Sequence, residues 1–158
     1  MTKYNSTALQ PEEIFTLKVS GTLLEGSLYK STSYNGSNSL LDGLYESRII
    51  FNYRNGNLIE RTQVGGSTMS YIWGYDNQYP VAQLQNATYS DIEGLTAFPA
   101  NFNLAMGGLT PAQDGALRTL KGALVTTMTF KIGEGMKSQT TPNKLTSYYE
   151  YDTFKRLK

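Results

Sequence analysis

The sequence predicts a mainly β fold, an antiparallel meander sheet of hairpins with one or two short helices packed on it. Apolar and polar residues alternate in several segments, turn-forming residues separate these segments, and helix-capping patterns are confined to residues 86–122. Tyr, Thr, Ser, Asn and Gly are abundant and charged residues make up only 17% of the chain, a composition that favours strands over a helical bundle. The 158 residues fit one domain.

The N-terminal residues show the weakest pattern. Pro11 followed by two glutamates suits the first turn of a helix, and the polar run 31–39 contains a turn at Asn35-Gly36. We therefore expect a partly ordered connector over residues 1–40. A β domain should follow over residues 41–158, with a helical insertion at 86–122.

The clearest hairpin lies at residues 45–64. Ile49, Phe51 and Tyr53 fall on one side of an alternating segment, and Asn55-Gly56 is the dipeptide best suited to a type I′ turn. Residues 57–64 return as the second strand. Glu60 then faces Phe51, on the side that the alternation predicts to be buried.

Further strands are expected at residues 68–75, 81–84, 123–132 and 145–151. In the first of these, Met69, Tyr71, Trp73 and Tyr75 share one face, and large apolar side chains at this spacing normally form a core. The strand at 123–132 places Leu124, Met128, Phe130 and Ile132 on one face, and Thr141-Pro142 begins the turn that precedes the strand 145–151.

Two short helices are expected at about 88–98 and 110–121. Thr88 or Ser90 can cap the first helix, with an acidic residue three positions later. Thr110 as cap, Pro111 at the first helical position and Gln113 form a stronger start signal, and Gly122 suits the stop.

A repeated pattern recurs three times in the chain: an aromatic strand, a Tyr-x turn and an apolar restart. Its structural residues are Tyr53, Gly56, Tyr75, Asp76, Tyr151, Asp152, Arg156 and Leu157. With these residues, Thr141-Pro142 and Thr146, the region 45–158 resembles the YD-repeat (Rhs-repeat) family of long bacterial surface and secreted proteins, of the kind found in Bacteroides-type bacteria.

The resemblance has definite departures. The family unit contains Thr-Asp-Pro-x-Gly and, after its Tyr-Asp, Gly-Arg-Leu. Here Thr141 replaces the Asp, Lys144 and Lys155 replace the two glycines, and Arg54 replaces the Asp of the first unit. A left-handed backbone, which glycine adopts freely, costs lysine about 1 kcal/mol or more.

The resemblance implies a non-enzymatic scaffold segment, since family arrays coil into a hollow β-shell around a variable cargo. It also implies an extracellular or cell-surface location, although this chain shows no signal peptide and no membrane span. The expected partners are neighbouring repeats or another copy, through exposed sheet edges. The alternative is a carbohydrate- or protein-binding module at the cell surface, with Trp73, Tyr71, Tyr75 and Tyr79 as its aromatic face.

Composition argues against other classes of function. The chain contains no His and no Cys, which excludes Ser-His-Asp and Cys-His catalysis within it, and Lys+Arg (14) nearly balance Asp+Glu (13), so we expect no nucleic-acid binding. Asp76, Glu150 and Asp152 are the candidates for a carboxylate pair, but an Asp in a turn usually bonds to nearby backbone. We therefore expect no catalytic residue, cofactor or metal site.

Overall fold

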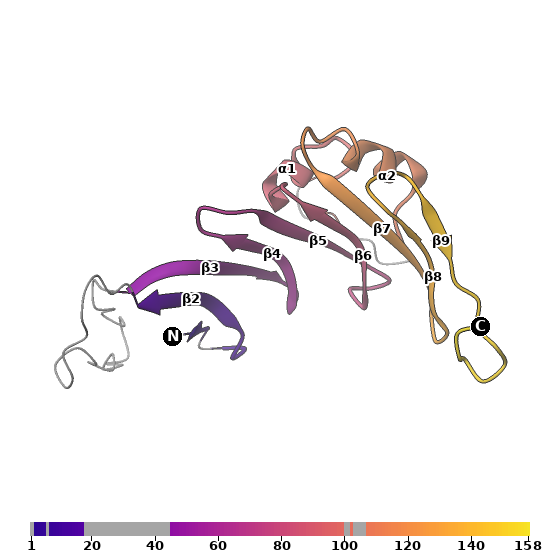
Figure 1. Cartoon of the computed structure of the whole chain (residues 1–158), viewed down its shortest axis with the longest axis horizontal. Coiled ribbons are helices and arrows are strands. Elements are labelled where there is room, and N and C mark those ends of the chain that lie inside the picture. The colour runs from indigo at the N-terminus through magenta and orange to yellow at the C-terminus, as the bar shows by residue number, and fades with distance from the viewer. Residues whose placement is uncertain (1, 6, 18–44, 100–101, 103–106) are drawn as a thin grey trace. The chain divides into compact units, whose positions relative to one another are not determined.

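The computed structural model describes residues 2–5, 7–17, 45–99, 102 and 107–158. Its elements are, in order, β1 (Thr2–Tyr4), β2 (Pro11–Leu17), β3 (Tyr45–Arg54), β4 (Asn57–Gln63), β5 (Thr68–Gly74), β6 (Tyr79–Gln85), α1 (Tyr89–Glu93), α2 (Pro111–Leu117), β7 (Leu124–Lys131), β8 (Gly135–Thr140) and β9 (Thr146–Tyr148). The strands form an antiparallel open sheet in which each is the neighbour of the next along the chain (Figure 1). This arrangement confirms the predicted fold class.

The chain divides into two compact units, Met1–Ile50 and Phe51–Lys158, so the division lies inside β3. The segment for which the sequence predicts only a partly ordered connector contains two strands, β1 and β2. The polar loop predicted over residues 31–39 lies outside the described residues.

In the unit Met1–Ile50, β2 pairs with β1 on one side and with the first part of β3 on the other. Pro11 is the first residue of β2, a position where a strand tolerates proline. The predicted helical turn at Pro11 is therefore wrong. Phe15 is buried, and Arg48 Nε donates to Thr16 Oγ1 across the β2–β3 pair at 2.8 Å.

The hairpin predicted around Asn55-Gly56 is present as β3 and β4. Asn55 has φ 51° and Gly56 has φ 80°, the left-handed pair that a type I′ turn requires. Glu60, expected on a buried face, is held by two hydrogen bonds: Oε1 accepts from Asn52 Nδ2 at 3.0 Å and Oε2 from the Tyr89 backbone N–H at 2.6 Å. Its carboxylate therefore ties β4 to the start of α1.

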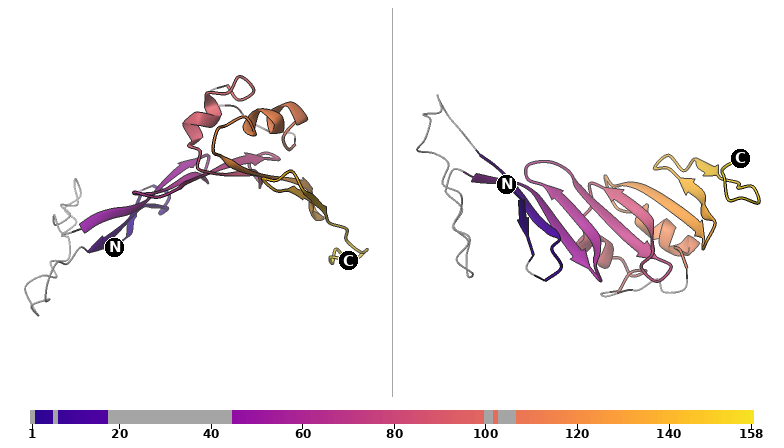
Figure 2. Two further views of the ribbon diagram at one scale, coloured as in Figure 1. Left: turned by 45° about the horizontal axis from the view of Figure 1, so that its top comes forward. Right: turned by 90° about the horizontal axis from the view of Figure 1, so that it is seen from below.

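Both predicted helices are present, and both are shorter than predicted. Thr88 caps α1 and forms a capping box with Asp91, while Thr110 does the same for α2 with Gln113, as the sequence predicts. Figure 2 shows the two helices on one side of the sheet in the unit Phe51–Lys158. In the described part of the chain, helix is confined to this insertion.

The core of this unit lies between the helices and strands β5, β6 and β7. Its fully buried large side chains are Ile72, Val81, Leu84, Ile92, Phe98 and Leu117, with Ser70 beside them. Ser70 Oγ donates to the Ala87 carbonyl oxygen at 2.7 Å, so the buried hydroxyl has its partner.

The buried face of β5 is not the one that the sequence predicts. Ser70, Ile72 and Gly74 are buried, whereas Met69, Tyr71 and Trp73 are only half-buried. A β-carbon on Gly74 would lie 2.5 Å from the Gly107 carbonyl oxygen, so the covering chain approaches too closely for larger residues. In β7 the predicted face is wrong at Leu124, which is 47% exposed beside the buried Val125, and at Ile132, which is 68% exposed just beyond the strand. Farther along, Met128 and Phe130 are half-buried as predicted.

Candidate functional site

The four aromatic residues of the predicted binding face do not form one surface. Trp73 is half-buried, and its indole Nε1 donates to the Leu58 carbonyl oxygen at 2.8 Å. Tyr71 directs its hydroxyl at Met69 Sδ, at 2.9 Å. The cavity beside Trp73 has a volume of about 20 Å³, which holds about one water molecule and no sugar ring.

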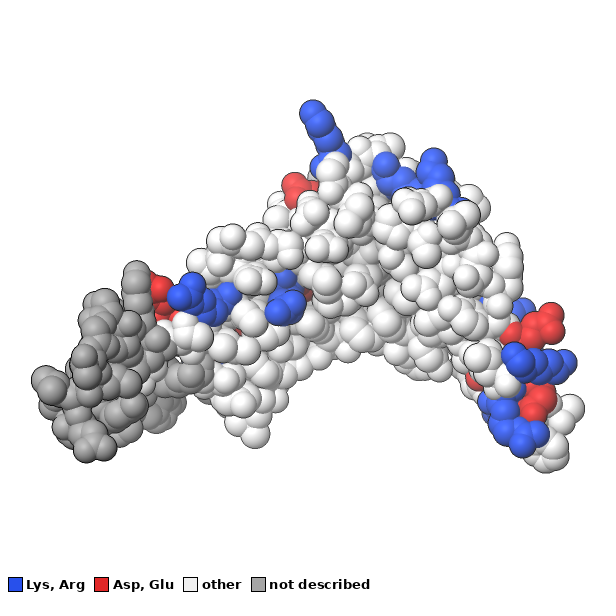
Figure 3. Space-filling model, viewed as in Figure 1, with Lys and Arg blue, Asp and Glu red and all other residues white. Residues whose placement is uncertain are grey.

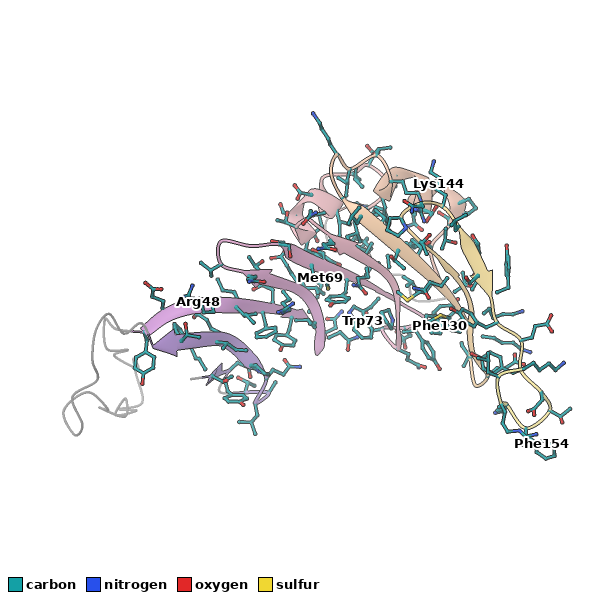
Figure 4. The ribbon with its side chains drawn as sticks, viewed as in Figure 1. Arg48, Met69, Trp73, Phe130, Lys144 and Phe154 are labelled. Atoms are coloured by element: carbon teal, nitrogen blue, oxygen red, sulfur yellow. The ribbon has the colours of Figure 1, made fainter. Side chains whose placement is uncertain are left out.

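Tyr75 and Tyr79 do come together, around Phe130 of β7. Tyr79 stacks on Phe130 with ring centroids 4.7 Å apart, and Tyr75 packs edge-on against both rings. Tyr75 Oη also accepts a hydrogen bond from the Phe130 backbone N–H at 3.0 Å. This aromatic cluster therefore joins the β5–β6 turn to β7; Figure 4 labels Phe130 on β7 and Trp73 on β5.

The Tyr151-Asp152 turn has the form that the repeat pattern predicts. Asp152 Oδ1 accepts from the backbone N–H groups of Phe154 and Arg156, and Oδ2 accepts from Arg156 Nε at 2.8 Å. The backbone hydrogen bond from Arg156 is the main reason that the pKa of Asp152 lies below its ordinary value. A bridge between Tyr151 and Leu157 closes the turn as a small hairpin.

The tyrosine of this turn packs on a glycine. A β-carbon on Gly135 would lie 2.7 Å from Tyr151 Oη, and that hydroxyl donates to the Met136 carbonyl oxygen at 3.1 Å. Tyr75 packs similarly, since a β-carbon on Gly108 would lie 3.3 Å from its hydroxyl oxygen. Two of the three predicted repeat tyrosines thus lie against glycine backbone.

The three predicted repeat turns differ in how they are closed. Asp76 is exposed and lies in a run of left-handed residues, with φ 51° at Tyr75, 56° at Asp76 and 61° at Asn77. Arg54, in the first unit, pairs with Glu93 at 2.8 Å. The carboxylate-capped turn is therefore found at Asp152, while the other two turns use different contacts.

The outer edge of β9 lies at the side of the sheet, next to the C-terminal turn (Figure 1). Thr146, Ser147 and Tyr148 are all exposed, and Tyr148 is 80% exposed. On the inner side, Thr141 N donates to Leu145 O, and Tyr149 N donates to Lys137 O, both at 2.9 Å. The backbone N–H and C=O groups of Leu145, Ser147 and Tyr149 thus face β8.

Alternate residues of a strand bond to opposite sides, so Thr146 and Tyr148 direct their backbone N–H and C=O groups away from the sheet. Glu150 follows the same alternation, because its outward carbonyl oxygen accepts a hydrogen bond from Lys158 N at 2.9 Å. A further strand could therefore pair with the outer edge of β9. Leu157 and Lys158 lie at the start of this position.

Of the candidate carboxylates, Glu150 lies near another acid. Glu134 and Glu150 line a surface hollow of about 230 Å³ together with lysines and tyrosines. Glu134 is paired with Lys131 at 2.6 Å, and that hydrogen bond lowers the pKa of Glu134, whereas a catalytic acid needs a raised pKa. Figure 3 shows acidic and basic side chains mixed at this C-terminal end.

Two polar clusters were not recognisable as sites in the sequence. Arg118, whose side chain is 11% exposed, bonds to Asp114 through Nε at 3.0 Å and to the Thr141 carbonyl oxygen at 3.1 Å. The guanidinium of Arg54 lies 4.7 Å from the Tyr89 ring centre. In the sequence, the i,i+4 spacing of Asp114 and Arg118 indicates the first of these contacts. The contact of Arg54 with Tyr89 has no such local signal. Both clusters join helices to the sheet.

In the described ranges no group of three or more acidic residues is placed to hold a metal ion. The same part of the chain contains no helix with the length and apolar character needed to cross a membrane. Comparisons of the chain with protein-family models, with curated proteins and with solved structures found no match.

Proposed function

We propose that this chain is a non-enzymatic scaffold segment of a bacterial surface or secreted protein of the YD-repeat (Rhs) type, in which the sheet extends by addition of strands at its edge. The proposal rests on the resemblance of the repeat residues and on the geometry of the last two turns. It includes an extracellular or cell-surface location.

The observation that carries the proposal is the backbone at two lysines. Lys144 and Lys155 stand where the family pattern has glycine, and their φ angles are 62° and 61°. These are left-handed conformations, which glycine adopts without strain. These angles support the proposal that both turns are repeat turns in which lysine has replaced glycine. The bonds of Asp152 to residues 154 and 156 support the same interpretation.

The environments of the acids support a structural role. Asp91 caps α1, Asp114 pairs with Arg118, and Asp152 closes the last turn. Each of these carboxylates stabilises a local structure through hydrogen bonds. We therefore propose that the segment has no catalytic activity of its own.

A glycan-binding face centred on Trp73 has less support. The polar atom of the indole is already bonded to Leu58, and the neighbouring cavity is too small for a sugar ring. Tyr75 and Tyr79 are engaged with Phe130. A sugar-binding platform needs an exposed aromatic face, and these rings are in contact with one another.

Strand addition is tested with a soluble synthetic peptide of alternating Thr and Val, flanked by lysines. Residue-resolved amide exchange should slow at Thr146 and Tyr148 when the peptide is added, while exchange at Ser147, which bonds inward, stays unchanged. In parallel, Trp73 fluorescence is followed during titration with polysaccharides. Saturable quenching by a glycan, without peptide protection of Thr146 and Tyr148, would favour the binding module over the scaffold.

A further inference from the structure

Two hydrogen-bond donors converge on the sulfur of Met69. The Tyr71 hydroxyl donates to Met69 Sδ at 2.9 Å, and the side-chain amide of Gln83 donates to the same atom through Nε2 at 3.3 Å. A thioether sulfur is a weak acceptor, whereas a phenol hydroxyl and a carboxamide are full donors. The two donors are therefore suited to a stronger acceptor than the sulfur they now contact.

The strand register brings these three side chains together. Tyr71 follows Met69 by two residues on β5, so both lie on the same face, and Gln83 of β6 is the register partner of Tyr71. The alternate residues Ser70 and Ile72 are buried on the face that the helices cover, which places Met69 on the other face. Met69, Tyr71 and Gln83 are each half-buried, so solvent reaches part of this cluster; Figure 4 labels Met69 on β5.

We propose that Met69 is a modification site for hydroperoxides, and that Tyr71 and Gln83 hold the oxygen of the methionine sulfoxide that forms. With hydrogen peroxide, the sulfur lone pair attacks one oxygen, so that an S–O bond forms and the O–O bond breaks. The sulfur loses two electrons, the peroxide gains them, and the proton of the transferred oxygen joins the departing hydroxide as water. This modification is separate from the scaffold role.

The new oxygen supplies the acceptor that the two donors lack. A sulfoxide is polar, and its oxygen is bonded to the atom at which the Tyr71 hydroxyl and the Gln83 amide already point. Both donors then change a weak hydrogen bond to sulfur for a stronger one to oxygen. The oxidised side chain is thus accommodated on the sheet by groups that are in place before the reaction.

Two other described methionines lack this arrangement. Met128 and Met136 are half-buried like Met69, but in the described part of the chain no group donates a hydrogen bond to either sulfur. Oxidation makes such a side chain polar, and a partly buried polar atom without a hydrogen-bond partner costs free energy. Oxidation at Met128 should therefore destabilise the fold, and oxidation at Met69 should be tolerated.

Two variants separate these cases. The first retains Met69 and carries Met106→Leu, Met128→Leu and Met136→Leu; the second retains Met128 and carries Met69→Leu, Met106→Leu and Met136→Leu. Met1 is common to both. Hydrogen peroxide is added to the folded chains, peptide mapping by mass spectrometry locates the added oxygen, and denaturant unfolding is measured before and after oxidation.

In the variant that retains Met69, oxidation should change the unfolding equilibrium constant by less than about threefold, because two hydrogen bonds replace the lost contacts with water. In the variant that retains Met128, oxidation should raise this constant about tenfold, or 1.4 kcal/mol. Equal changes in the two variants would overturn the proposal. So would resistance of Met69 to peroxide under conditions that oxidise Met128.

Tyr71→Phe removes the hydroxyl and keeps the ring, so it tests whether this donor holds the oxygen. Added to the variant that retains Met69, it should make oxidation raise the unfolding constant about tenfold. In the native chain, the Gln83 side-chain amide resonances should shift on oxidation, while those of Gln113, which donates to the Ala97 carbonyl oxygen, stay unchanged. If Tyr71→Phe leaves the tolerance intact and the Gln83 resonances do not shift, the proposal is wrong.

Discussion

Within the unit Phe51–Lys158, strands β5 and β9 belong to the same antiparallel sheet but have opposite surroundings. β5 pairs with a strand on each side and is covered by the helical insertion, so that Ile72 is completely buried. Among the described strands β9 pairs with β8 alone, and its three residues are all exposed. Because burial of apolar side chains is the main favourable term in folding, we expect the helix-covered strands to contribute more to the free energy of folding than the edge strand.

Removing a buried aromatic ring should have the largest effect. Phe98 is completely buried, whereas Phe154 is 78% exposed. Phe98→Ala should lower the free energy of unfolding by about 3–5 kcal/mol, because it removes apolar contacts and leaves a cavity. Phe154→Ala should change it by less than about 0.5 kcal/mol. Denaturant unfolding of both variants measures the difference, and equal effects would show that the core is wrongly placed.

Removing Arg118 should have the next largest effect. Arg118→Met keeps much of the volume of the side chain and removes the bonds to Asp114 and to the Thr141 carbonyl oxygen. We expect a loss of about 2–3 kcal/mol, since Asp114 would remain partly buried without its cation. Lys131→Met, at an exposed ion pair with Glu134, is the control and should cost less than about 1 kcal/mol. A similar loss in both variants would contradict the role of Arg118.

The contribution of Asp114 to stability should appear in how the free energy of unfolding changes at acid pH. Burial raises its pKa, but hydrogen bonds from Arg118 and Thr127 and the nearby positive charges lower it more, so that it lies below the ordinary value of 3.8. The folded state then holds this proton less tightly than the unfolded state, and the contribution of Asp114 is complete above about pH 4. It is lost as the pH falls through the lower, folded pKa.

The measurement is the difference in free energy of unfolding between the native chain and Asp114→Asn. We expect this difference to be constant above about pH 4 and to shrink at lower pH. A difference that stays constant down to the acid transition would mean that Asp114 is not stabilised by its partners.

Glycine in place of the two left-handed lysines should have a small stabilising effect. Lys144→Gly and Lys155→Gly relieve left-handed strain at φ 62° and 61°, and each should add about 0.5–1 kcal/mol after the greater freedom of glycine in the unfolded chain is deducted. The control, Lys131→Gly, lies in the extended strand β7 and should be destabilising. Destabilisation by all three would mean that the repeat turns are not formed.

Local signals predict much of this fold. Asn55-Gly56 and the Thr110-Gln113 capping box act within a few residues, so sequence spacing is sufficient to find them. The buried face of β5 could not be predicted in the same way. Alternation shows which residues share a face, but which face the helices cover depends on the distant chain around Gly107, which packs on Gly74.

The candidate site shows the same limit. An Asp side chain can bond to backbone a few residues away, and the Tyr-Asp pattern predicts this turn at Asp152. The same pattern at Tyr75-Asp76 gives a left-handed turn instead, so the dipeptide alone does not decide the turn. The contact of Arg118 with Thr141 joins residues far apart in the sequence and has no local signal. The large side chains around Trp73 predict a core or a binding face equally well, since periodicity does not reveal that the indole bonds to Leu58.

Amide exchange along β9 in dilute solution tests the free edge most directly. Ser147 and Tyr149 bond toward β8, and Thr146 and Tyr148 point outward. At concentrations where the chain is monomeric, we expect slow exchange at Ser147 and Tyr149 and fast exchange at Thr146 and Tyr148. Protection of Thr146 and Tyr148 equal to that of Ser147 in the monomer would show that the outer edge is already occupied, and would contradict the scaffold account.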